Sequence, residues 1–267
     1  MGETVDVKRE GAIAKVVMHR GGNNAIAPDL VDGLEAAFEE LGKDESVRCI
    51  VLASEYEKYF SVGADLTAMA GSVDRDAPDA LQKLTAMIER MDAQFSSIEA
   101  CPKPVIAAIN GHALGGGCEL TLCCDYRIMV EDGRSKIGQS EAALGIMPGA
   151  GGTQRLPRLI GKARALPLLL EAARLSAQEA EAIGLVTKAV APQELQSEVA
   201  ALADRLSKAA TLALGLIKDA VNRGLDLPLE EALRVEAGNF ARTALSEDAV
   251  IGVMAFLQKQ EPEFKGR

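Results

Sequence analysis

Tryptophan is absent from this 267-residue sequence, and aromatic residues make up only 3% of it. The core must therefore consist mainly of Ala, Leu, Ile and Val, with Met filling irregular gaps. Such a composition is typical of helices packed closely on strands. A chain of this length can bury most of its apolar surface without the help of disulfides or bound metals.

Cysteine and histidine are also scarce, and their positions do not suggest a metal site. The five cysteines are odd in number, no two of them form a C-x-x-C pair, and no His-rich segment accompanies them. We therefore expect buried free thiols and no metal ion. This usage of cysteine is typical of a reduced, cytoplasmic protein.

Further absences limit the expected partners. Residues 1–10 alternate polar and apolar side chains without a signal-peptide core, and no apolar run approaches the ~20 residues of a membrane helix. The formal net charge is −10, so the basic footprint that nucleic-acid binding requires is missing. We expect neither a membrane nor a nucleic acid as partner, although a few local Lys or Arg residues can still hold a phosphate-bearing ligand.

The order of hydrophobic patterns predicts an α/β fold. Short alternating or continuously apolar runs indicate strands at 4–8, 13–18, 49–52, 104–109, 126–130 and 135–138. A hairpin with its turn at 131–133 is expected to join the last two strands. Apolar residues spaced three and four apart over 81–98 predict a helix. We expect a strand-and-helix core over 1–195 and a helical region over 196–267.

Three consecutive glycines, residues 115–117, stand where one strand candidate, ending at Ile109, leads into a helix. Glycine allows close backbone approach by a ligand, and a helix N-terminus offers unpaired N–H groups to a developing oxyanion. Glu119 falls in the first turn of that helix. A tight packing turn explains the glycines equally well, whereas a phosphate loop would need the Walker or G-x-G-x-x-G spacing.

Two more clusters carry polar groups. Glu141 follows Gly-Gln-Ser and precedes a run rich in Gly and apolar residues, which favours a raised pKa. Two carboxylates in different environments can act as an acid/base couple, as Glu119 and Glu141 would, although a Glu before a helix is usually a surface cap. Residues 59–66 end a strand in a Gly turn, and the next amide, that of Ala64, could point into a pocket.

Together these segments resemble the crotonase superfamily, the enoyl-CoA hydratase/isomerase family. The likeness covers nearly the whole chain: Asn-Ala-Ile at 24–26, then the segments 60–65, 110–119, 138–141 and 148–155, and the terminal Phe-Lys-Gly-Arg. The resemblance implies a spiral of strand-strand-helix turns with a C-terminal helical oligomerisation region. It also implies a homo-oligomer, either a trimer or a hexamer made as a dimer of trimers.

The resemblance implies roles for residues as well. Two backbone amides that hold the thioester oxygen correspond to Ala64 and Gly116. Glu119 would take a proton from water as it attacks C3, and Glu141 would deliver a proton to C2. The implied activity is that of an enoyl-CoA hydratase, which adds water reversibly to 2-trans-enoyl-CoA in fatty-acid β-oxidation or related acyl-CoA degradation. No metal or redox cofactor is needed, because CoA is part of the substrate.

Residues that contact CoA or the acyl chain are implied in the same way. Phe256 and Lys259 correspond to C-terminal residues that contact CoA, often from a neighbouring subunit. Met69 is expected to line the acyl tunnel, with loop 71–80 as a lid. One departure from the family is Thr67, which stands where a Lys that contacts CoA phosphate is frequent.

Other interpretations of the same residues remain open. Isomerisation of 3-enoyl-CoA to 2-enoyl-CoA needs only one base, and some relatives are non-catalytic scaffolds or RNA-binding proteins. The presence of both glutamates favours hydration, and the acidic charge disfavours RNA. His112 would need a Gly-x-Ser-x-Gly elbow to serve a Ser-His-Asp triad. Cys118 could be a nucleophile or a packed side chain, and Gln139 could orient a carboxylate or simply pack.

Overall fold

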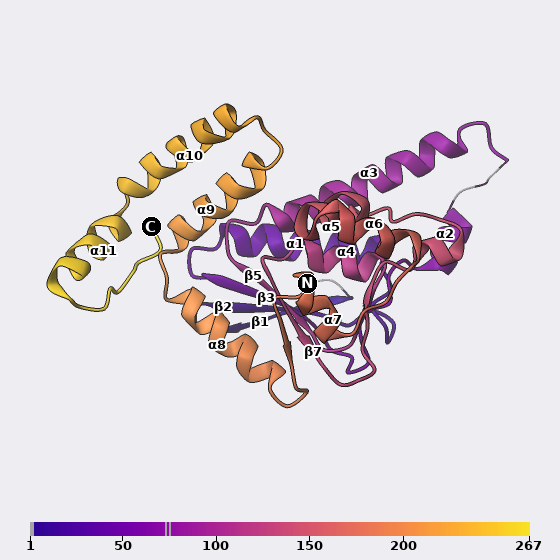
Figure 1. The fold of residues 1–267 in the computed structure, drawn as a ribbon, viewed down its shortest axis with the longest axis horizontal. Helices are drawn as coiled ribbons and strands as arrows, with labels where there is room; N and C mark the ends of the chain where they lie inside the picture. The colour runs from indigo at the N-terminus through magenta and orange to yellow at the C-terminus, as the bar shows by residue number, and fades with distance from the viewer. Residues whose placement is uncertain (1–2, 73, 75) are drawn as a thin grey trace.

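The computed structural model of the protein describes residues 3–72, 74 and 76–267 (Figure 1). Its largest sheet has the strand order β1-β2-β3-β5-β7-β9. These strands are β1 (Val5–Glu10), β2 (Ile13–Met18), β3 (Cys49–Ser54), β5 (Val105–Ile109), β7 (Tyr126–Val130) and β9 (Lys188–Val190). Only β1 and β2 pair antiparallel, and every later pair is parallel. The central strands β3 and β5 are almost entirely apolar because both faces of this sheet are covered.

A second, three-stranded parallel sheet has the order β4-β6-β8. Its strands are β4 (Tyr59–Ser61), β6 (His112–Leu114) and β8 (Ile137–Gly138). Each follows a strand of the large sheet after a short connection and precedes a helical segment, so the chain repeats a strand-strand-helix unit. This arrangement confirms the expected α/β fold with its spiral of such units.

The expected hairpin around residues 131–133 is wrong. The strands on either side of this turn, β7 and β8, belong to different sheets, so the turn carries the chain from one sheet to the other. Strand β8 is also shorter than predicted and covers only Ile137–Gly138. It pairs with β6 on one side, and on the other side Ile137 exchanges backbone hydrogen bonds with Leu175. An alternation of apolar and polar residues indicates a strand but does not identify the strand that pairs with it.

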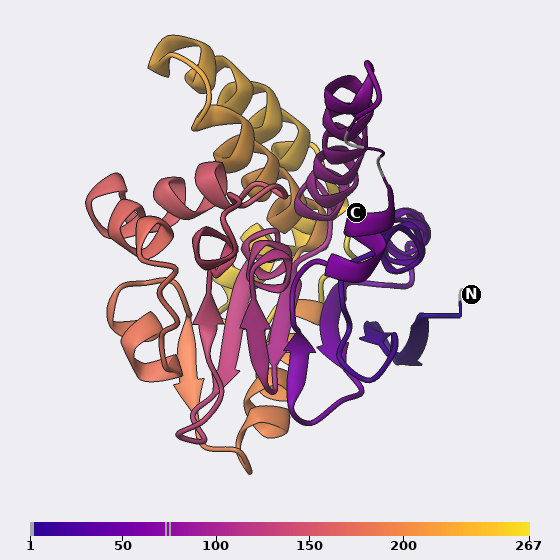
Figure 2. The same ribbon diagram turned by 90° about the vertical axis from the view of Figure 1, so that its right-hand side faces the viewer.

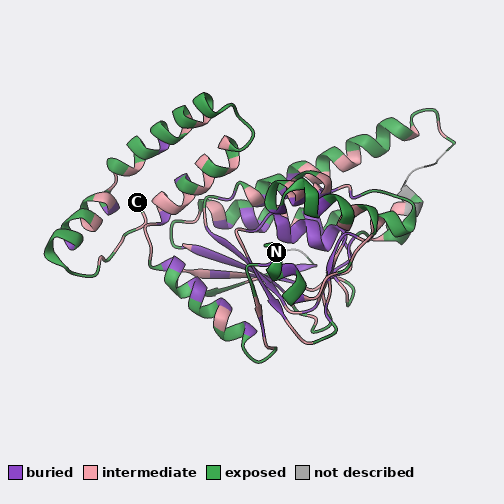
Figure 3. Cartoon of the chain, viewed as in Figure 1, coloured by how far each residue is buried: buried purple, intermediate pink, exposed green. Residues whose placement is uncertain are grey.

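Helices cover both faces of the large sheet. The first face carries α1 (Pro28–Lys43), α3 (Ala80–Glu99) and α4 (Gly116–Leu122), whose buried residues join one apolar core with the sheet (Figure 3). The other face carries α8 (Leu195–Ser207), where Val199, Leu202 and Leu206 pack on strand residues such as Ile106. Four further helical segments surround the small sheet: α2 (Leu66–Ser72), η1 (Glu141–Leu144), α5 (Gly152–Ile160) and α6 (Lys162–Leu170), with α7 (Ala177–Ala182) beside β9.

The last three helices extend away from the sheets as an arm (Figures 1 and 2). They are α9 (Thr211–Gly224), α10 (Leu229–Ala244) and α11 (Glu247–Gln258). Large apolar side chains remain exposed along them, including Ile217, Phe240 and Leu245. This surface is consistent with the expected helical oligomerisation region, and the division of the chain at residue 195 stays a prediction.

Two further features concern the cysteines and the helices. All five cysteines are free and buried. Within the described residues, no helix has the length and apolar character needed to cross a membrane. The lid expected at 71–80 includes residues 73 and 75, which lie outside the described residues.

Candidate active site

The glycine run lets α4 begin directly against the end of β4. Gly115 precedes the helix with φ 53°, in the left-handed region that favours glycine. A Cβ on Gly117 would lie 2.5 Å from the carbonyl oxygen of Ser61, and a Cβ on Gly63 would lie 2.7 Å from that of Leu114. The packing-turn interpretation of these glycines is therefore correct, and the same close approach also exposes backbone amides.

The amides of Ala64 and Gly116 come together at this junction. A Cβ built on Gly116 would lie 3.7 Å from the nitrogen of Ala64, and one built on Gly63 would lie 3.2 Å from the nitrogen of Gly116. Neither amide donates a hydrogen bond to any residue that the structure describes. Two unpaired donors that converge on one point can hold an oxyanion.

The loop that carries Ala64 is fixed from both sides. Ile26 donates its amide to Gly63 and accepts from the amide of Asp65, at 2.7 and 2.9 Å. The carboxylate of Asp65 caps α2 through the amide of Ala68 and pairs with Arg20 at 3.1 Å. Asp65 therefore has a structural role, and the Ala64 amide is held in place.

Glu119 is buried in the first turn of α4, with only 2% of its surface exposed. Its Oε1 accepts hydrogen bonds from the amides of Ala150 at 2.9 Å and Gly152 at 2.7 Å. Its second oxygen, Oε2, accepts no hydrogen bond from the described residues. One oxygen therefore fixes the carboxylate, and the other is available to a water molecule.

Burial raises the pKa of Glu119 to about 7. The hydrogen bond from Gly152 works in the opposite direction, and the negative charge of Glu141 adds to the increase. A carboxyl group with this pKa can both accept and release a proton near neutral pH, which general acid/base catalysis requires.

Glu141 begins η1 beside the glycine run. A Cβ on Gly115 would lie 2.7 Å from its Oε1, so the carboxylate reaches the start of α4. Burial raises the pKa of Glu141, and the amides of Ser140 and Glu141 itself partly offset the effect. Oriented to satisfy its surroundings, the buried amide of Gln139 donates to both oxygens of Glu141 at 3.2 Å. The expectation that Gln139 can orient a carboxylate thus agrees with the structure.

The structure brings the two glutamates and the two amides together but leaves the other predicted contacts apart. Met69 lies partly buried on α2, five residues after Ala64. Phe256 is 82% exposed. With Lys259, which ends α11, it lies at the far end of the molecule from α2 (Figure 1). Within one chain, Phe256 and Lys259 do not reach the glutamate pair.

Two alternative nucleophile systems find no support. The Nδ1 atom of His112 accepts a hydrogen bond from the amide of Lys136, which keeps the ring in a structural position. Burial raises the pKa of the Cys118 thiol far above its usual value, so that the thiolate does not form. Among the described residues, no group of three or more His, Cys, Asp or Glu side chains could hold a metal ion.

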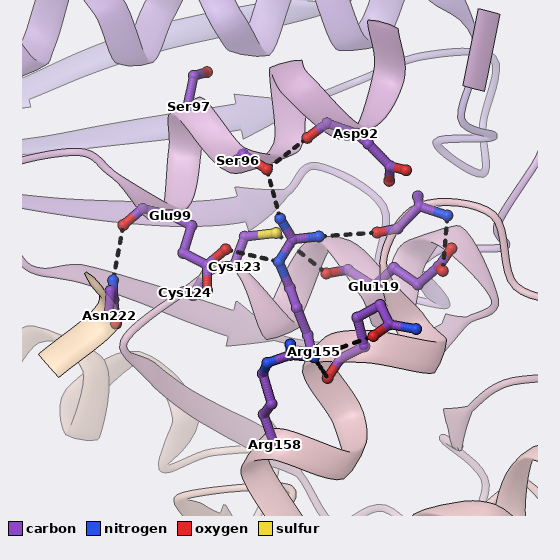
Figure 4. A network of polar contacts seen from close by, with 12 residues as sticks. Asp92, Ser96, Ser97, Glu99, Glu119, Cys123, Cys124, Arg155, Arg158 and Asn222 are labelled. Carbon is purple, nitrogen blue, oxygen red and sulfur yellow. Dashed lines mark hydrogen bonds and ion pairs between the residues drawn. The ribbon is translucent and has the colours of Figure 1, made fainter. Parts of the chain in front are cut away.

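Sequence reasoning missed a second polar network, centred on Arg155 in α5 (Figure 4). Its guanidinium pairs with Glu99 at 2.7 Å, donates to the hydroxyl of Ser96 at 2.8 Å and to the carbonyl of Ala150 at 3.2 Å. The network connects α3 with the loop that holds Glu119. The only signal in the sequence was that Arg155 ends the Pro-Gly-Ala-Gly-Gly-Thr-Gln-Arg segment.

These features define a class of protein: a spiral α/β fold with two open amides beside one buried and one partly buried carboxylate. The chain belongs to the enoyl-CoA hydratase/isomerase family, whose sequence model matches residues 8–267. This confirms the resemblance inferred from the sequence. Crotonyl-CoA hydratase from Syntrophomonas wolfei is 38% identical over 263 residues, 98% of each chain.

Two further relatives agree. 2,3-Dehydroadipyl-CoA hydratase from Escherichia coli is 39% identical over 246 residues, which are 92% of this chain and 90% of that one. The crystal structure of an enoyl-CoA hydratase from Bacillus anthracis superposes with a TM-score of 0.90 at 33% identity, covering 99% of this chain and 100% of that one.

Proposed function

We propose that the protein is an enoyl-CoA hydratase that adds water to 2-trans-enoyl-CoA and forms 3-hydroxyacyl-CoA. The observation that carries this proposal is the pair Glu119 and Glu141 beside the open amides of Ala64 and Gly116. Family membership and the hydratases among its relatives support the same reaction.

The geometry supports a division of labour between the four groups. The amides of Ala64 and Gly116 bind the thioester oxygen and draw electron density from C3. The free oxygen of Glu119 accepts a proton from water as the water oxygen bonds to C3. Glu141, whose pKa burial raises, keeps a share of its protons and delivers one to C2.

Crotonyl-CoA is the substrate for the direct test, in which the loss of the enoyl-thioester absorbance is followed. Glu119→Gln and Glu141→Gln should each reduce kcat by at least about 100-fold, a typical contribution of one acid or base. Glu181→Gln is the matched control, because it removes a glutamate that is exposed on α7. The proposal fails if the unaltered protein hydrates neither crotonyl-CoA nor longer 2-enoyl-CoAs.

Isomerisation of 3-enoyl-CoA to 2-enoyl-CoA is separated from hydration by the same variants. One base suffices to move a proton between two carbons, so an isomerase would keep its main activity in one of the two Glu→Gln variants. Hydration needs both groups, because a proton leaves water and another reaches carbon. Loss in both variants therefore distinguishes a hydratase.

The remaining assignments concern the rest of the substrate and the assembly. We infer that Phe256 and Lys259 contact CoA in a neighbouring subunit, since they are remote from the glutamates of their own chain. This requires a homo-oligomer, a trimer or a dimer of trimers, joined through residues 196–267. Light scattering gives its mass, and Lys259→Ala should raise KM for crotonyl-CoA while leaving kcat largely unchanged. We place the reaction in the cytoplasm, with no metal or redox cofactor and with Met69 beside the acyl chain.

A further inference from the structure

Asp92 on α3 carries a carboxylate that has no hydrogen-bond partner at one oxygen. Its Oδ1 atom is buried and accepts no hydrogen bond from the described residues. A buried acceptor without a partner is destabilising, so an unpaired carboxylate oxygen in this position calls for an explanation.

The helix face that carries Asp92 covers the loop that holds Glu119. Ile88, one turn earlier, would lie 3.6 Å from a Cβ on Gly149. Ser96, one turn later, accepts a hydrogen bond from Arg155. Residues four apart share one face of a helix, so Asp92 lies between these two contacts on the same face. Figure 4 shows its carboxylate on the side of the network occupied by Glu119.

Arg155 is the cation near this carboxylate, and its hydrogen bonds go elsewhere. Its guanidinium nitrogens donate to Glu99, Ser96 and the carbonyl of Ala150. The positive charge of Arg155 acts on the carboxylate of Asp92, but the two side chains share no hydrogen bond. Asp92 therefore does not serve as a structural ion-pair partner.

Glu119 and Glu141 are held by different segments. The amides of Ala150 and Gly152 hold Glu119, in the loop that the Asp92 face of α3 covers, whereas the Glu141 carboxylate lies beside Gly115. Glu141 is therefore next to the open amides where the thioester would bind. If C3 sits beside Glu119, the carbons beyond C3 run away from the thioester, on the side of Asp92.

We propose that Asp92 is a specificity-determining residue of the hydratase reaction inferred above. It selects 2-enoyl thioesters whose chain beyond C3 carries an uncharged hydrogen-bond donor, such as a hydroxyl, and disfavours chains that end in a methyl or a carboxylate. This inference rests on the proposed function and adds the chemical class of the acyl group.

The charges around Asp92 determine which acyl chains are preferred. A hydroxyl would supply the donor that Oδ1 lacks, and hydrogen bonds to charged groups are stronger than neutral ones. A methyl group would leave the acceptor unpaired. A carboxylate would add a negative charge beside Asp92 and Glu119, while the only facing cation, Arg155, is already paired with Glu99 among the described residues.

The test compares kcat/KM for four thioesters. Crotonyl-CoA ends at C4 and serves as the reference. 2-Heptenoyl-CoA and 6-hydroxy-2-hexenoyl-CoA have chains of equal length and differ only in the terminal methyl or hydroxyl. 2-Hexenedioyl-CoA carries a terminal carboxylate. The unaltered protein should prefer the hydroxylated chain to the methyl-ended chain by about tenfold or more, the effect of one hydrogen bond to a charged group.

Two variants at Asp92 and one control complete the experiment. Asp92→Leu should reverse the preference in favour of 2-heptenoyl-CoA, and Asp92→Asn should raise the relative activity on 2-hexenedioyl-CoA by removing the repulsion. Asp92→Asn preserves shape and provides a second readout if the Asp92→Leu variant does not fold. Glu89→Gln removes an exposed acid from the same helix and should match the unaltered protein.

The possible failures can be told apart. Suppose that crotonyl-CoA is hydrated, but that the ratio of hydroxylated to methyl-ended substrate is the same in the unaltered protein and in both Asp92 variants. The inference about Asp92 is then overturned, and the hydratase function stands. If crotonyl-CoA itself is not hydrated and neither are the longer thioesters, the proposed function fails and the inference fails with it.

Discussion

The amide of Gly152 donates a 2.7 Å hydrogen bond to Oε1 of Glu119 and leaves no space for a side chain of its own. A Cβ at Gly152 would lie 2.8 Å from that oxygen and 2.7 Å from the side-chain amide of Gln139. Glycine is required here by the close approach of two functional side chains. The residue that orients the proposed base therefore cannot gain a side chain without displacing that base or Gln139.

Gly152→Ala should lower kcat for crotonyl-CoA by about 100-fold, because a shift of about 1 Å in a catalytic group can have that effect. Gly149→Ala in the same loop is the control, since its Cβ would meet only the side chain of Ile88 at an ordinary 3.6 Å. Steady-state kinetics of both variants checks the prediction. Equal kcat values in the two variants would show that Glu119 tolerates displacement.

The rate should depend on pH through Glu119. Its pKa of about 7, raised chiefly by burial, means that the carboxylate needed to accept a proton from water is lost as the pH falls through neutrality. We expect kcat/KM for crotonyl-CoA to rise as the pH increases through about 7, because Glu119 then becomes the carboxylate. A profile that stays flat from about pH 5 to 8 would remove Glu119 as the base.

The ionisation of Glu119 should also affect folding stability. A rise in pH should lower the stability, whereas it should raise the rate. The pKa of Glu119 lies at about 7 in the folded protein and at 4.5 in an ordinary environment. Between these values the folded protein keeps a proton that the unfolded chain has released, so stability falls as the pH rises. Each pKa unit corresponds to about 1.4 kcal/mol, which gives roughly 3 kcal/mol at about pH 8.

Glu119→Gln should remove that loss, since the amide oxygen can still accept from Ala150 and Gly152 and carries no charge. The variant is expected to be more stable than the unaltered protein at about pH 8 and equally stable at about pH 4. Urea unfolding at the two pH values measures the difference. A variant that is less stable at both would mean that the buried carboxylate stabilises the fold.

The spiral core could be predicted because its signals in the sequence are local. Apolar runs identified β3 and β5, and the glycine run identified the start of α4 with Glu119 in its first turn. The pairing of strands is not local, which is why the hairpin at 131–133 was wrong. Strand β9, three residues in a chain segment with a helical pattern, was missed because it is too short for alternation to appear.

The backbone groups of the candidate site could be predicted from the sequence. The side chains that reach it from remote segments could be predicted only in part. Asn24 was noted as part of a motif, but its role could not be read from the sequence. It adopts φ 51°, and its side-chain amide donates to Met18, Ser54 and Phe60. Asp92 was not noticed at all. A lone acid in a helix is usually solvated, and only the packing of α3 against the Gly149 loop reveals that this one is not.

Gln139 should act on the reaction through Glu141. Its buried amide, donating to both carboxylate oxygens at 3.2 Å, holds Glu141 in place and favours its charged form. Gln139→Met keeps the length of the side chain and removes the donor, so it should lower kcat by about tenfold, the lower range for one orienting hydrogen bond. KM should change little, because Gln139 does not touch the thioester oxygen.

The pH profile of Gln139→Met separates an orienting role from a packing role. The part of the profile that depends on Glu141 should move to higher pH, since Glu141 would keep its proton longer without the donor. Gln154→Met, at an exposed position on α5, is the control and should leave both kcat and the profile unchanged. An altered KM with an unchanged pH profile would instead assign Gln139 to packing alone.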